Sequence, residues 1–315
     1  MSSVTLDNAS VAKRSLRKAQ LQIHFCVLLW GFTAILGKLI TLPALALVFW
    51  RMLMVTTALL LVPRVWRGLH AMQPRLLLSY AGVGAIVALH WLSFYASIKL
   101  SNASVAATCI AIGPVFLAVL EPWIARSKFE PRELLIGIGA IPGVALVVGG
   151  IPDQMRVGVA VGVVSAFLVA LFSAFNKRLV EHADPFTVTA IELGTGAGFL
   201  GLVAVALPHS GNVFAPPGLH DVALLLVLAL ACTLVPFTLS LIALRHLSAF
   251  AVELAVNLEP VYAIILAIVL LGEQRELGIA FYCGVAIILG AVFVHPLLDR
   301  RKPHRTETNV AGCAD

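Results

Sequence analysis

Three polar side chains lie in one apolar stretch, residues 249–271, and their types suit binding of a cation or a proton. Glu259 falls about 15 Å into this stretch, near the middle of a layer about 30 Å thick, and precedes Pro260, which leaves a helical carbonyl free. Glu253 and Asn257 are four residues apart and share one helix face. We predict that Glu259 and Asn257 meet the charged end of a ligand, together with Glu253. The alternatives are a hydrogen-bonded structural role for Glu259 and a solvated gate role for Glu253.

Histidine and tryptophan side chains in other apolar stretches could complete such a site. His90, in the sequence ALHWLSFY, is followed directly by Trp91. A neutral histidine could hydrogen-bond a ligand, or it could titrate and exchange protons; the alternative is a residue that serves helix packing alone. Trp30 and Trp91 could present aromatic faces to a cation or a ring, whereas we expect Trp50 to be structural or to lie near a membrane surface.

Arg51 and Glu192 are two more charges inside apolar stretches, and their depths argue against a direct ion pair. Each is expected about 10 Å deep from opposite faces of a layer about 30 Å thick, which leaves roughly 10 Å between them in depth. We therefore predict that each finds local partners or water and anchors the structure. Glu121 is also expected to be structural, and the side chains of Lys38 and Lys177 are expected to extend to the membrane surface.

The composition indicates which elements position these residues. Hydrophobic residues make up 60% of the 315 residues, charged residues make up 12%, and the mean hydropathy is +0.98. A soluble domain carries about 25% charged residues, so this chain cannot cover its surface with polar groups, and much of that surface must face lipid. Placing a charged side chain at the centre of a bilayer costs about 2.5–3.5 kcal/mol, which also explains why so few charges lie inside the apolar stretches.

Apolar runs of about 20 residues, the length that crosses a bilayer as a helix, predict about ten transmembrane helices. The strands of a membrane barrel would alternate apolar and polar residues over about ten positions, and these runs do not alternate. The predicted fold is therefore an all-α integral membrane protein. The expected spans are residues 21–40, 44–63, 77–98, 102–125, 133–150, 157–178, 185–207, 219–244, 249–271 and 277–297.

The positive charges predict the orientation of these spans. With the N-terminus inside, the 22 Lys and Arg residues divide into 17 inside, 4 outside and Arg51 within a span. Cytoplasmic segments of membrane proteins carry this excess, so both termini are predicted in the cytoplasm, and the net charge of +6 does not point to nucleic acid. Residues 1–20 are expected to precede a retained signal anchor, and the tail 299–315 is expected to be disordered.

The sequence has no pattern typical of a metal, cofactor or catalytic site. Cys26, Cys109, Cys232 and Cys283 lie inside predicted spans without metal-site or CxxC spacing, so apolar packing explains them better. The glycine-rich sequence GTGAGFLG at 194–201 also lies within a span, where close helix packing explains it better than phosphate binding. With no HExxH, P-loop or nucleophile-elbow motif present, we expect no cofactor, no metal and no enzymatic activity.

Two stretches of the chain resemble each other and predict an internal repeat. ASVAATCIAIGPVFLAVLEP and AFAVELAVNLEPVYAIILAI carry Pro114 and Pro260 at the same offset. The halves are then residues 1–150 and 151–298, and five helices in each half invert the second relative to the first. Inverted repeats are a common building principle of secondary transporters. The two prolines are expected to be helix breaks or gating points.

Three stretches carry a resemblance to a known family: LWGFTAILGK at 29–38, VFWRMLM at 48–54 and LEPVYAIILAIVLLGEQ at 258–274. They resemble the EamA family of the drug/metabolite transporter superfamily, over nearly the whole chain. The resemblance implies a ten-helix fold, a central cavity lined mainly by helices 1, 3, 4, 6, 8 and 9, and export of amino acids or related metabolites. Gly113 of the first half stands where the second half has Glu259, so the halves are chemically unequal at the predicted centre.

The sequence therefore predicts a secondary transporter that exports amino acids or related small metabolites across the bacterial inner membrane by alternating access. Two alternatives need a similar cavity: a lipid or isoprenoid-carrier flippase, and an efflux pump for cationic drugs. The expected partners are the lipid bilayer, a small-molecule substrate and coupling protons, with no nucleic acid. A monomer and a homodimer both fit the sequence.

Overall fold

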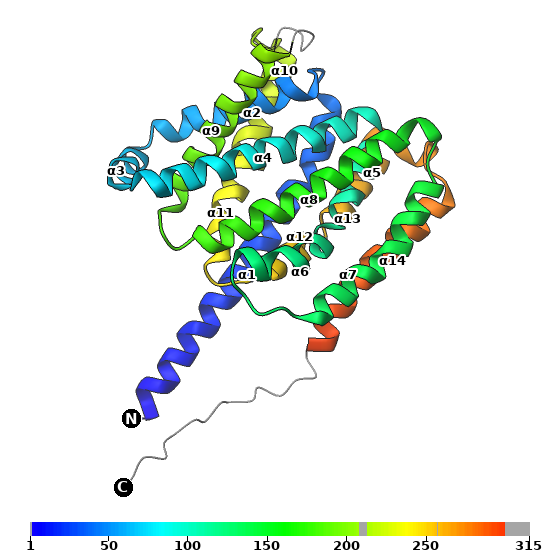
Figure 1. Cartoon of the computed structure of the whole chain (residues 1–315). Coiled ribbons are helices and arrows are strands. Elements are labelled where there is room, and N and C mark those ends of the chain that lie inside the picture. The colour runs from blue at the N-terminus through cyan, green and yellow to red at the C-terminus, as the bar shows by residue number, and fades with distance from the viewer. Residues whose placement is uncertain (1, 208–212, 257, 300–315) are drawn as a thin grey trace.

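The structure is a computed structural model that describes residues 2–207, 213–256 and 258–299, and every element in those ranges is helical (Figure 1). The predicted all-α class is confirmed for this part of the chain. The α-helices are α1 (Ser2–Leu39), α2 (Ala44–Leu60), α3 (Pro63–Ala71), α4 (Pro74–Leu100), α5 (Ala103–Ile110), α6 (Gly113–Ile124), α7 (Pro131–Gly149), α8 (Arg156–Leu179), α9 (Pro185–Ala206), α10 (Leu219–Leu226), α11 (Val235–Leu244), α12 (Ala249–Val256), α13 (Glu259–Leu266) and α14 (Ile279–Asp299). The short 3₁₀ and π-helical segments are η1 (Asp153–Met155), η2 (Val227–Leu234), η3 (Ala267–Leu271) and η4 (Glu273–Arg275).

These helices cover each stretch in which the apolar runs predict a span. Among the described residues, seven helical segments are long and apolar enough to cross a membrane, or up to eight if α2 and α3, which are bent by 91°, form one broken span. These segments indicate that the chain is a membrane protein with several spans. The count of ten spans, the inverted halves and the cytoplasmic termini stay predictions.

Two features at the N-terminal side differ in extent from the expected spans. The segment 1–20, predicted as a separate cytoplasmic piece, is helical from Ser2 and continuous with the first span in α1. At 38 residues α1 is about 57 Å long, so its first half extends beyond the other helices, as Figure 1 shows in blue. Helix α3 was not expected, because nine residues are too short to stand out as an apolar run.

The predicted disordered tail lies outside the described residues from position 300 onward.

The helices pack in pairs that join distant parts of the sequence. Helix α1 packs against α11, α4 against α8, α2 against α9, and α7 against α14. Between these pairs lie two helices that are broken near their middles: α5 and α6 form one, and α12 and α13 form the other. Helix α5 contacts α13, and α6 contacts α12, so the two broken helices lie against each other at the centre of the bundle.

Both breaks occur just before the prolines that the repeat aligns. Pro114 is the second residue of α6, which is separated from α5 by two residues, and Pro260 is the second residue of α13. Proline is favoured in the first turn of a helix, where its missing N–H costs nothing, and it disfavours helical continuity with the preceding turn. Each proline therefore starts a new helix within what a hydropathy plot reads as a single span.

Lysine side chains satisfy carbonyl groups at the ends of two helices. Lys177 donates from Nζ to the carbonyl oxygens of Leu244 (2.6 Å) and Leu247 (2.7 Å), at the end of α11. Lys99 donates to the carbonyl oxygen of Ile40 at the end of α1. The last carbonyls of a helix lack partners within it, and a cation there also meets the negative end of the helix dipole. Lys177 thus has a capping role that the expectation of an extended surface lysine did not include.

The contact between α7 and α14 depends on two glycines. A Cβ atom added at Gly284 would lie 2.4 Å from the carbonyl oxygen of Gly143, and one added at Gly143 would lie 2.7 Å from the carbonyl oxygen of Gly284. Both distances are shorter than a carbon–oxygen contact allows, so the backbones approach closely only because both side chains are absent. Small residues at helix crossings are typical of membrane bundles, where close packing replaces the hydrophobic driving force.

We expect Gly284→Ala to destabilise the protein by about 1–3 kcal/mol, because the added methyl group must push the two backbones apart. Gly290→Ala is the matched control on the same helix, since no atom lies within 4 Å of a Cβ there. Thermal unfolding in detergent should show a lower midpoint for Gly284→Ala and an unchanged or higher one for Gly290→Ala. Equal midpoints for the two variants would contradict the close approach.

Candidate functional site

A cavity lies at the centre of the bundle, between the broken helices and the helices that flank them. The centres of water molecules can occupy about 80 Å³ of this cavity, which is enough space for several waters. Its wall combines large apolar and aromatic side chains with a small set of polar ones, which is the usual make-up of a small-molecule site. The polar lining residues are Thr33, Arg51, His90, Ser173, Asn176, Ser240, Glu253 and Glu259, and the aromatic ones are Trp30, Trp91, Phe94, Phe172 and Phe237.

The cavity brings together most of the residues singled out in the sequence. Glu259, Glu253, His90, Trp30 and Trp91 all line it. They come from α1, α4, α12 and α13, and α5, α8 and α11 also contribute to the wall, in agreement with the helices that the family resemblance implied. The predicted site residue Asn257 lies outside the described residues. Glu192, which was expected to be structural, does not line the cavity.

Arg51 lines the cavity from α2 and is only 2% exposed. Its Nε donates to Thr233 Oγ1 at 2.6 Å, and its Nη1 donates to Tyr95 Oη at 2.8 Å. Its guanidinium carbon lies 3.8 Å from the centre of the Trp91 ring, which is a cation–π contact. Arg51 and Glu192 form no ion pair in the described part of the chain, and Arg51 instead has local partners.

The position of Arg51 changes what Trp91 can offer a ligand. One face of the Trp91 ring is covered by the guanidinium, and the ring also makes a T-shaped contact with Phe237 at a centroid distance of 5.9 Å. That covered face cannot also bind a ligand cation. Trp30 has no aromatic or cation–π contact of this kind among the described residues. The role predicted for Trp30 and Trp91, an aromatic face for a ligand cation or ring, therefore stays a prediction for Trp30.

His90 is held by the neighbouring helix α8. Its Nδ1 lies 2.9 Å from both the carbonyl oxygen and Oγ of Ser165, and Ser165 Oγ donates to the carbonyl oxygen of His90 at 3.0 Å. The ring also packs against Phe172 at a centroid distance of 5.4 Å. A ring bound through Nδ1 presents its other nitrogen, Nε2, on the opposite side. His90 thus combines the packing role and the cavity position that the sequence left open as alternatives.

Two glutamates line the cavity from the second broken helix. Glu259 is the first residue of α13, directly after the break, and is 7% exposed. Glu253 is 2% exposed, and its Oε1 accepts a hydrogen bond of 2.6 Å from Ser173 Oγ. Its Oε2 has no hydrogen-bond partner among the described residues. Neither glutamate forms an ion pair with Arg51 within the described ranges, although all three residues line the same cavity.

Glu192 lies beside the cavity rather than in it. Its Oε2 accepts a hydrogen bond of 3.3 Å from Nδ2 of Asn176, which does line the cavity. Glu192 Oε1 and Asn176 Oδ1 are buried without a hydrogen-bond partner in the described part of the chain. Buried polar atoms of this kind are costly unless water reaches them, so this pair extends the polar region of the site towards α9.

Two further glutamates, which the sequence did not assign to the site, hold the broken helices. Glu273 Oε1 accepts from the backbone N–H of Ala103 (3.0 Å), and Glu273 Oε2 accepts from the N–H of Ser104 (3.0 Å), at the start of α5. Glu121 accepts from the N–H groups of Ala249 (3.1 Å) and Phe250 (2.8 Å) at the start of α12. Each carboxylate thus caps the broken helix of the other half, where the helix dipole also favours a negative charge.

A glycine helps to position one of these caps. Gly272 has φ of 70°, a left-handed conformation that glycine adopts without steric cost, and it ends η3 directly before Glu273. The Gly-Glu pair was visible in the sequence as the end of the ninth span. Its contact with the first half was not, because that contact joins residues about 170 positions apart.

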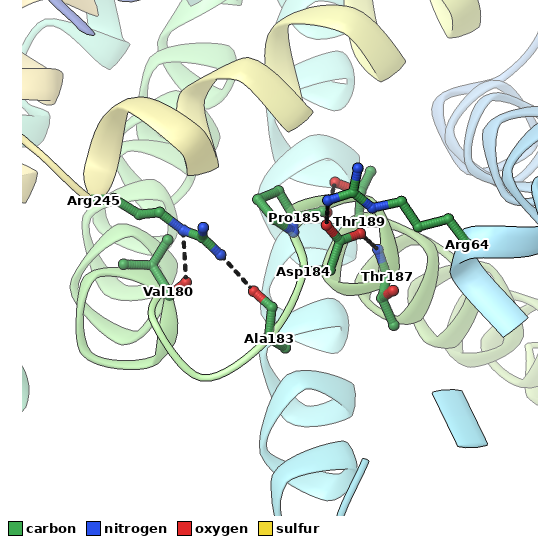
Figure 2. A network of polar contacts seen from close by, with 8 residues as sticks. All are labelled: Arg64, Val180, Ala183, Asp184, Pro185, Thr187, Thr189 and Arg245. Carbon is green, nitrogen blue, oxygen red and sulfur yellow. Dashed lines mark hydrogen bonds and ion pairs between the residues drawn. The ribbon is translucent and has the colours of Figure 1, made fainter. Parts of the chain in front are cut away.

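Arginines hold the connection between α8 and α9, as Figure 2 shows. Arg245, at the end of α11, donates to the carbonyl oxygens of Val180 (3.3 Å) and Ala183 (2.7 Å). Arg64 of α3 forms an ion pair with Asp184. The connection is therefore tied both to α3 and to α11, at the end of the bundle that the positive charges predict to be cytoplasmic.

Comparison with known proteins gives the family. The sequence pattern of the EamA-like transporter family matches this chain over residues 17–149 and again over residues 156–295. The chain belongs to the EamA-like transporter family. This family is part of the drug/metabolite transporter superfamily, so the resemblance inferred from the sequence is confirmed.

Relatives of this EamA protein are described as uncharacterized transporters. The uncharacterized transporter YxxF of Bacillus subtilis is 23% identical over 295 residues, which cover 89% of this chain and 92% of that protein. An uncharacterized transporter of Archaeoglobus fulgidus is 26% identical over 288 residues, which cover 88% and 96%. A crystal structure with 16% sequence identity covers 91% of this chain and 99% of its own with a TM-score of 0.66, which shows a shared fold.

Tryptophan fluorescence can test whether the cavity is separated from lipid in this EamA protein. Trp91 is 7% exposed and faces the cavity, whereas Trp123 is 82% exposed on the outside of α6. In variants that keep one of these tryptophans and carry Trp→Phe at the others, brominated lipid should quench Trp123 strongly and Trp91 weakly. Equal quenching in reconstituted vesicles would place Trp91 against lipid and contradict the cavity.

Proposed function

We propose that this EamA protein is a secondary transporter that exports amino acids or related small metabolites across the bacterial inner membrane, and that it does no enzymatic chemistry. The observation that carries the proposal is the central cavity, whose wall holds one arginine and two glutamates among aromatic and apolar side chains. A small amphipathic molecule with charged groups fits that wall, because charges at bilayer depth are maintained where they meet a substrate or an ion. The export direction is carried over from the family resemblance.

Two observations support two inverted halves with ten spans. The family pattern matches once in each proposed half. In addition, the first span (α1) packs against the eighth (α11). Their counterparts in the other half, the sixth span (α8) and the third (α4), pack against each other in the same way. Such an exchange of equivalent contacts is expected of two related halves that face each other across a pseudo-two-fold axis in the membrane plane. With an even number of spans, both termini lie on one side, and the excess of positive charge predicts the cytoplasm.

The reciprocal caps fit transport by alternating access. Glu121 caps α12 at the end predicted to be cytoplasmic, and Glu273 caps α5 at the end predicted to be external. We infer that each cap closes its own end of the cavity, and that rocking of the halves releases one cap while the other stays intact. The breaks before Pro114 and Pro260 supply the flexible points in this movement.

Removing one cap should loosen only one end of the bundle. Glu121→Gln takes away the negative charge from the start of α12, so its first amides, at Ala249 and Phe250, should exchange hydrogen faster, by about tenfold for a loss near 1.4 kcal/mol. Glu273→Gln should have this effect at Ala103 and Ser104 instead, so each variant controls for the other. Faster exchange at both ends in both variants would indicate general destabilisation and contradict separate caps.

The transport function is tested by counterflow in liposomes. Purified protein is reconstituted and screened with labelled amino acids, nucleosides and cationic drugs, with and without a pH gradient. Glu259→Gln should lower exchange of the accepted substrate by about tenfold or more, because a carboxylate that meets a substrate charge contributes at least about 1.4 kcal/mol. Glu181→Gln, on the exposed connection after α8, is the control and should exchange normally.

Other outcomes of the screen separate the alternatives. Saturable exchange of amino acids supports the proposal, and a pH effect that is lost in His90 or Glu259 variants would assign proton coupling to those residues. Exchange of cationic drugs alone would favour drug efflux. A folded protein that exchanges none of these compounds and keeps copurified lipid through detergent would favour a lipid or isoprenoid-carrier flippase. Normal exchange by Glu259→Gln would remove that residue from the binding site.

A further inference from the structure

The guanidinium of Arg51 is bound from behind the cavity wall. Its Nε and Nη1 donate to Thr233 Oγ1 and Tyr95 Oη, at 2.6 and 2.8 Å. Neither of these two partners lines the cavity, whereas Arg51 does. Among the described residues, these bonds leave Nη2 and the second hydrogen of Nη1 without a hydrogen-bond partner, so these are the donors that a ligand in the cavity can meet.

The Trp91 ring and the two hydrogen bonds together fix the plane of the guanidinium. Trp91 covers one face at 3.8 Å, and Tyr95 lies nearby with its ring centre 5.5 Å from the guanidinium carbon. A guanidinium held in this way offers a planar edge with two parallel N–H groups, the geometry that matches a carboxylate. A lysine could supply the charge at this position but not the two fixed donors.

The negative charges of the cavity lie on another element of its wall. Glu253 and Glu259 come from α12 and α13, whereas Arg51 comes from α2, and none of these residues pairs with another in an ion pair among the described residues. Glu253 is 2% exposed and has an oxygen, Oε2, without a hydrogen-bond partner in the same ranges. Glu253 thus has a buried carboxylate oxygen, and Arg51 has N–H donors, that a ligand in the cavity can bond.

We propose that Arg51 binds the carboxylate of a zwitterionic α-amino acid, whose ammonium group is bound by Glu253 and Glu259. The inference rests on the proposed function and assigns the residues that bind the two charged groups of its substrate. The side chain of the amino acid packs against Trp30, Phe94 and Phe172, which favours apolar and aromatic amino acids. Arg51 thus acts as a substrate-binding residue and not only as the structural anchor that its position in the sequence suggested.

This assignment predicts strong discrimination against amines. An amine that lacks the carboxylate would leave the donors of Arg51 buried and unpaired, and a site built to bond a polar group rejects analogues without it far more strongly than it rejects a missing methylene. The same reasoning disfavours lipophilic cationic drugs, which carry no carboxylate. The guanidinium therefore separates an amino-acid transporter from a cation efflux pump that has a similar aromatic cavity.

The experiment is competition counterflow with the best amino acid from the screen, using unlabelled amino acid or its decarboxylated amine as competitor. In the wild-type protein the amine should compete at least about tenfold more weakly than the amino acid. In Arg51→Gln the amino acid should lose at least about tenfold in apparent affinity, while the amine keeps its own, so the two become nearly equal competitors. Arg51→Lys should recover part of the affinity and little of the discrimination.

Thr233→Val and Tyr95→Phe keep the test decisive if Arg51→Gln does not fold. Each removes one hydrogen bond that orients the guanidinium while leaving its charge in place. Discrimination between amino acid and amine should fall in both variants without loss of thermal stability large enough to unfold the protein. Unchanged discrimination in a folded Arg51→Gln protein, or in both of the other variants, would overturn the assignment.

Failure of the proposed function has a different signature. It appears in the wild-type protein, as absence of amino-acid exchange across the whole panel, before any variant is measured. Failure of the Arg51 assignment appears only when the wild-type protein exchanges amino acids and Arg51→Gln discriminates as well as the wild type does. Wild-type exchange in which the amine competes as well as the amino acid would also reject the carboxylate requirement.

Discussion

The structure depends on the satisfaction of backbone groups at the starts of the two broken central helices. The first N–H groups of a helix have no intrahelical partner, and each such group costs several kcal/mol if it is buried and left alone. Glu273 supplies this bonding for α5 and Glu121 supplies it for α12, with four backbone hydrogen bonds of 2.8–3.1 Å. Because each carboxylate reaches a helix of the other half, the interactions that allow the helices to start also join the halves. The first turn of each broken helix is therefore fixed to the other half of the chain.

Broken helices in turn explain why the cavity can hold charge. Glu259 occupies the first position of α13, where the positive end of the helix dipole favours a carboxylate and no intrahelical hydrogen bond is lost. A charge in the middle of an uninterrupted helix would have neither benefit. Arg51 is stabilised by different means, through Thr233, Tyr95 and the Trp91 ring. Thr233 lies in the π-helical segment η2, and π-helical turns are frequent at functional positions because they redirect side chains.

Much of the architecture was predictable because it follows from local patterns. Apolar runs located the helices, and the aligned Pro114 and Pro260 located the breaks, since a proline acts on its own turn. The depth argument for Arg51 and Glu192 was also sufficient to exclude an ion pair. The partners of Arg51 could not be predicted, because Tyr95 and Thr233 are 44 and 182 residues away and only the packing of α2, α4 and η2 brings them together. The guanidinium over one face of Trp91 could not be predicted for the same reason, and the caps by Glu121 and Glu273 depend on contacts between the halves.

The family pattern matches each half of the chain, but the two halves carry unequal chemistry at the aligned prolines. In the proposed alternating-access mechanism, equivalent packing of the halves would permit two conformations of similar energy, a condition for movement between them. A binding site built equally from both halves would not distinguish the two ends of an asymmetric substrate. At Gly113, the counterpart of Glu259, an added Cβ would come within 3.3 Å of Oε2 of Glu253. The absent side chain of the first half thus leaves room beside the carboxylate of the second. Glu253 and Glu259 come from α12 and α13 and Arg51 comes from α2, an arrangement that fits the proposed binding of a zwitterion in one orientation.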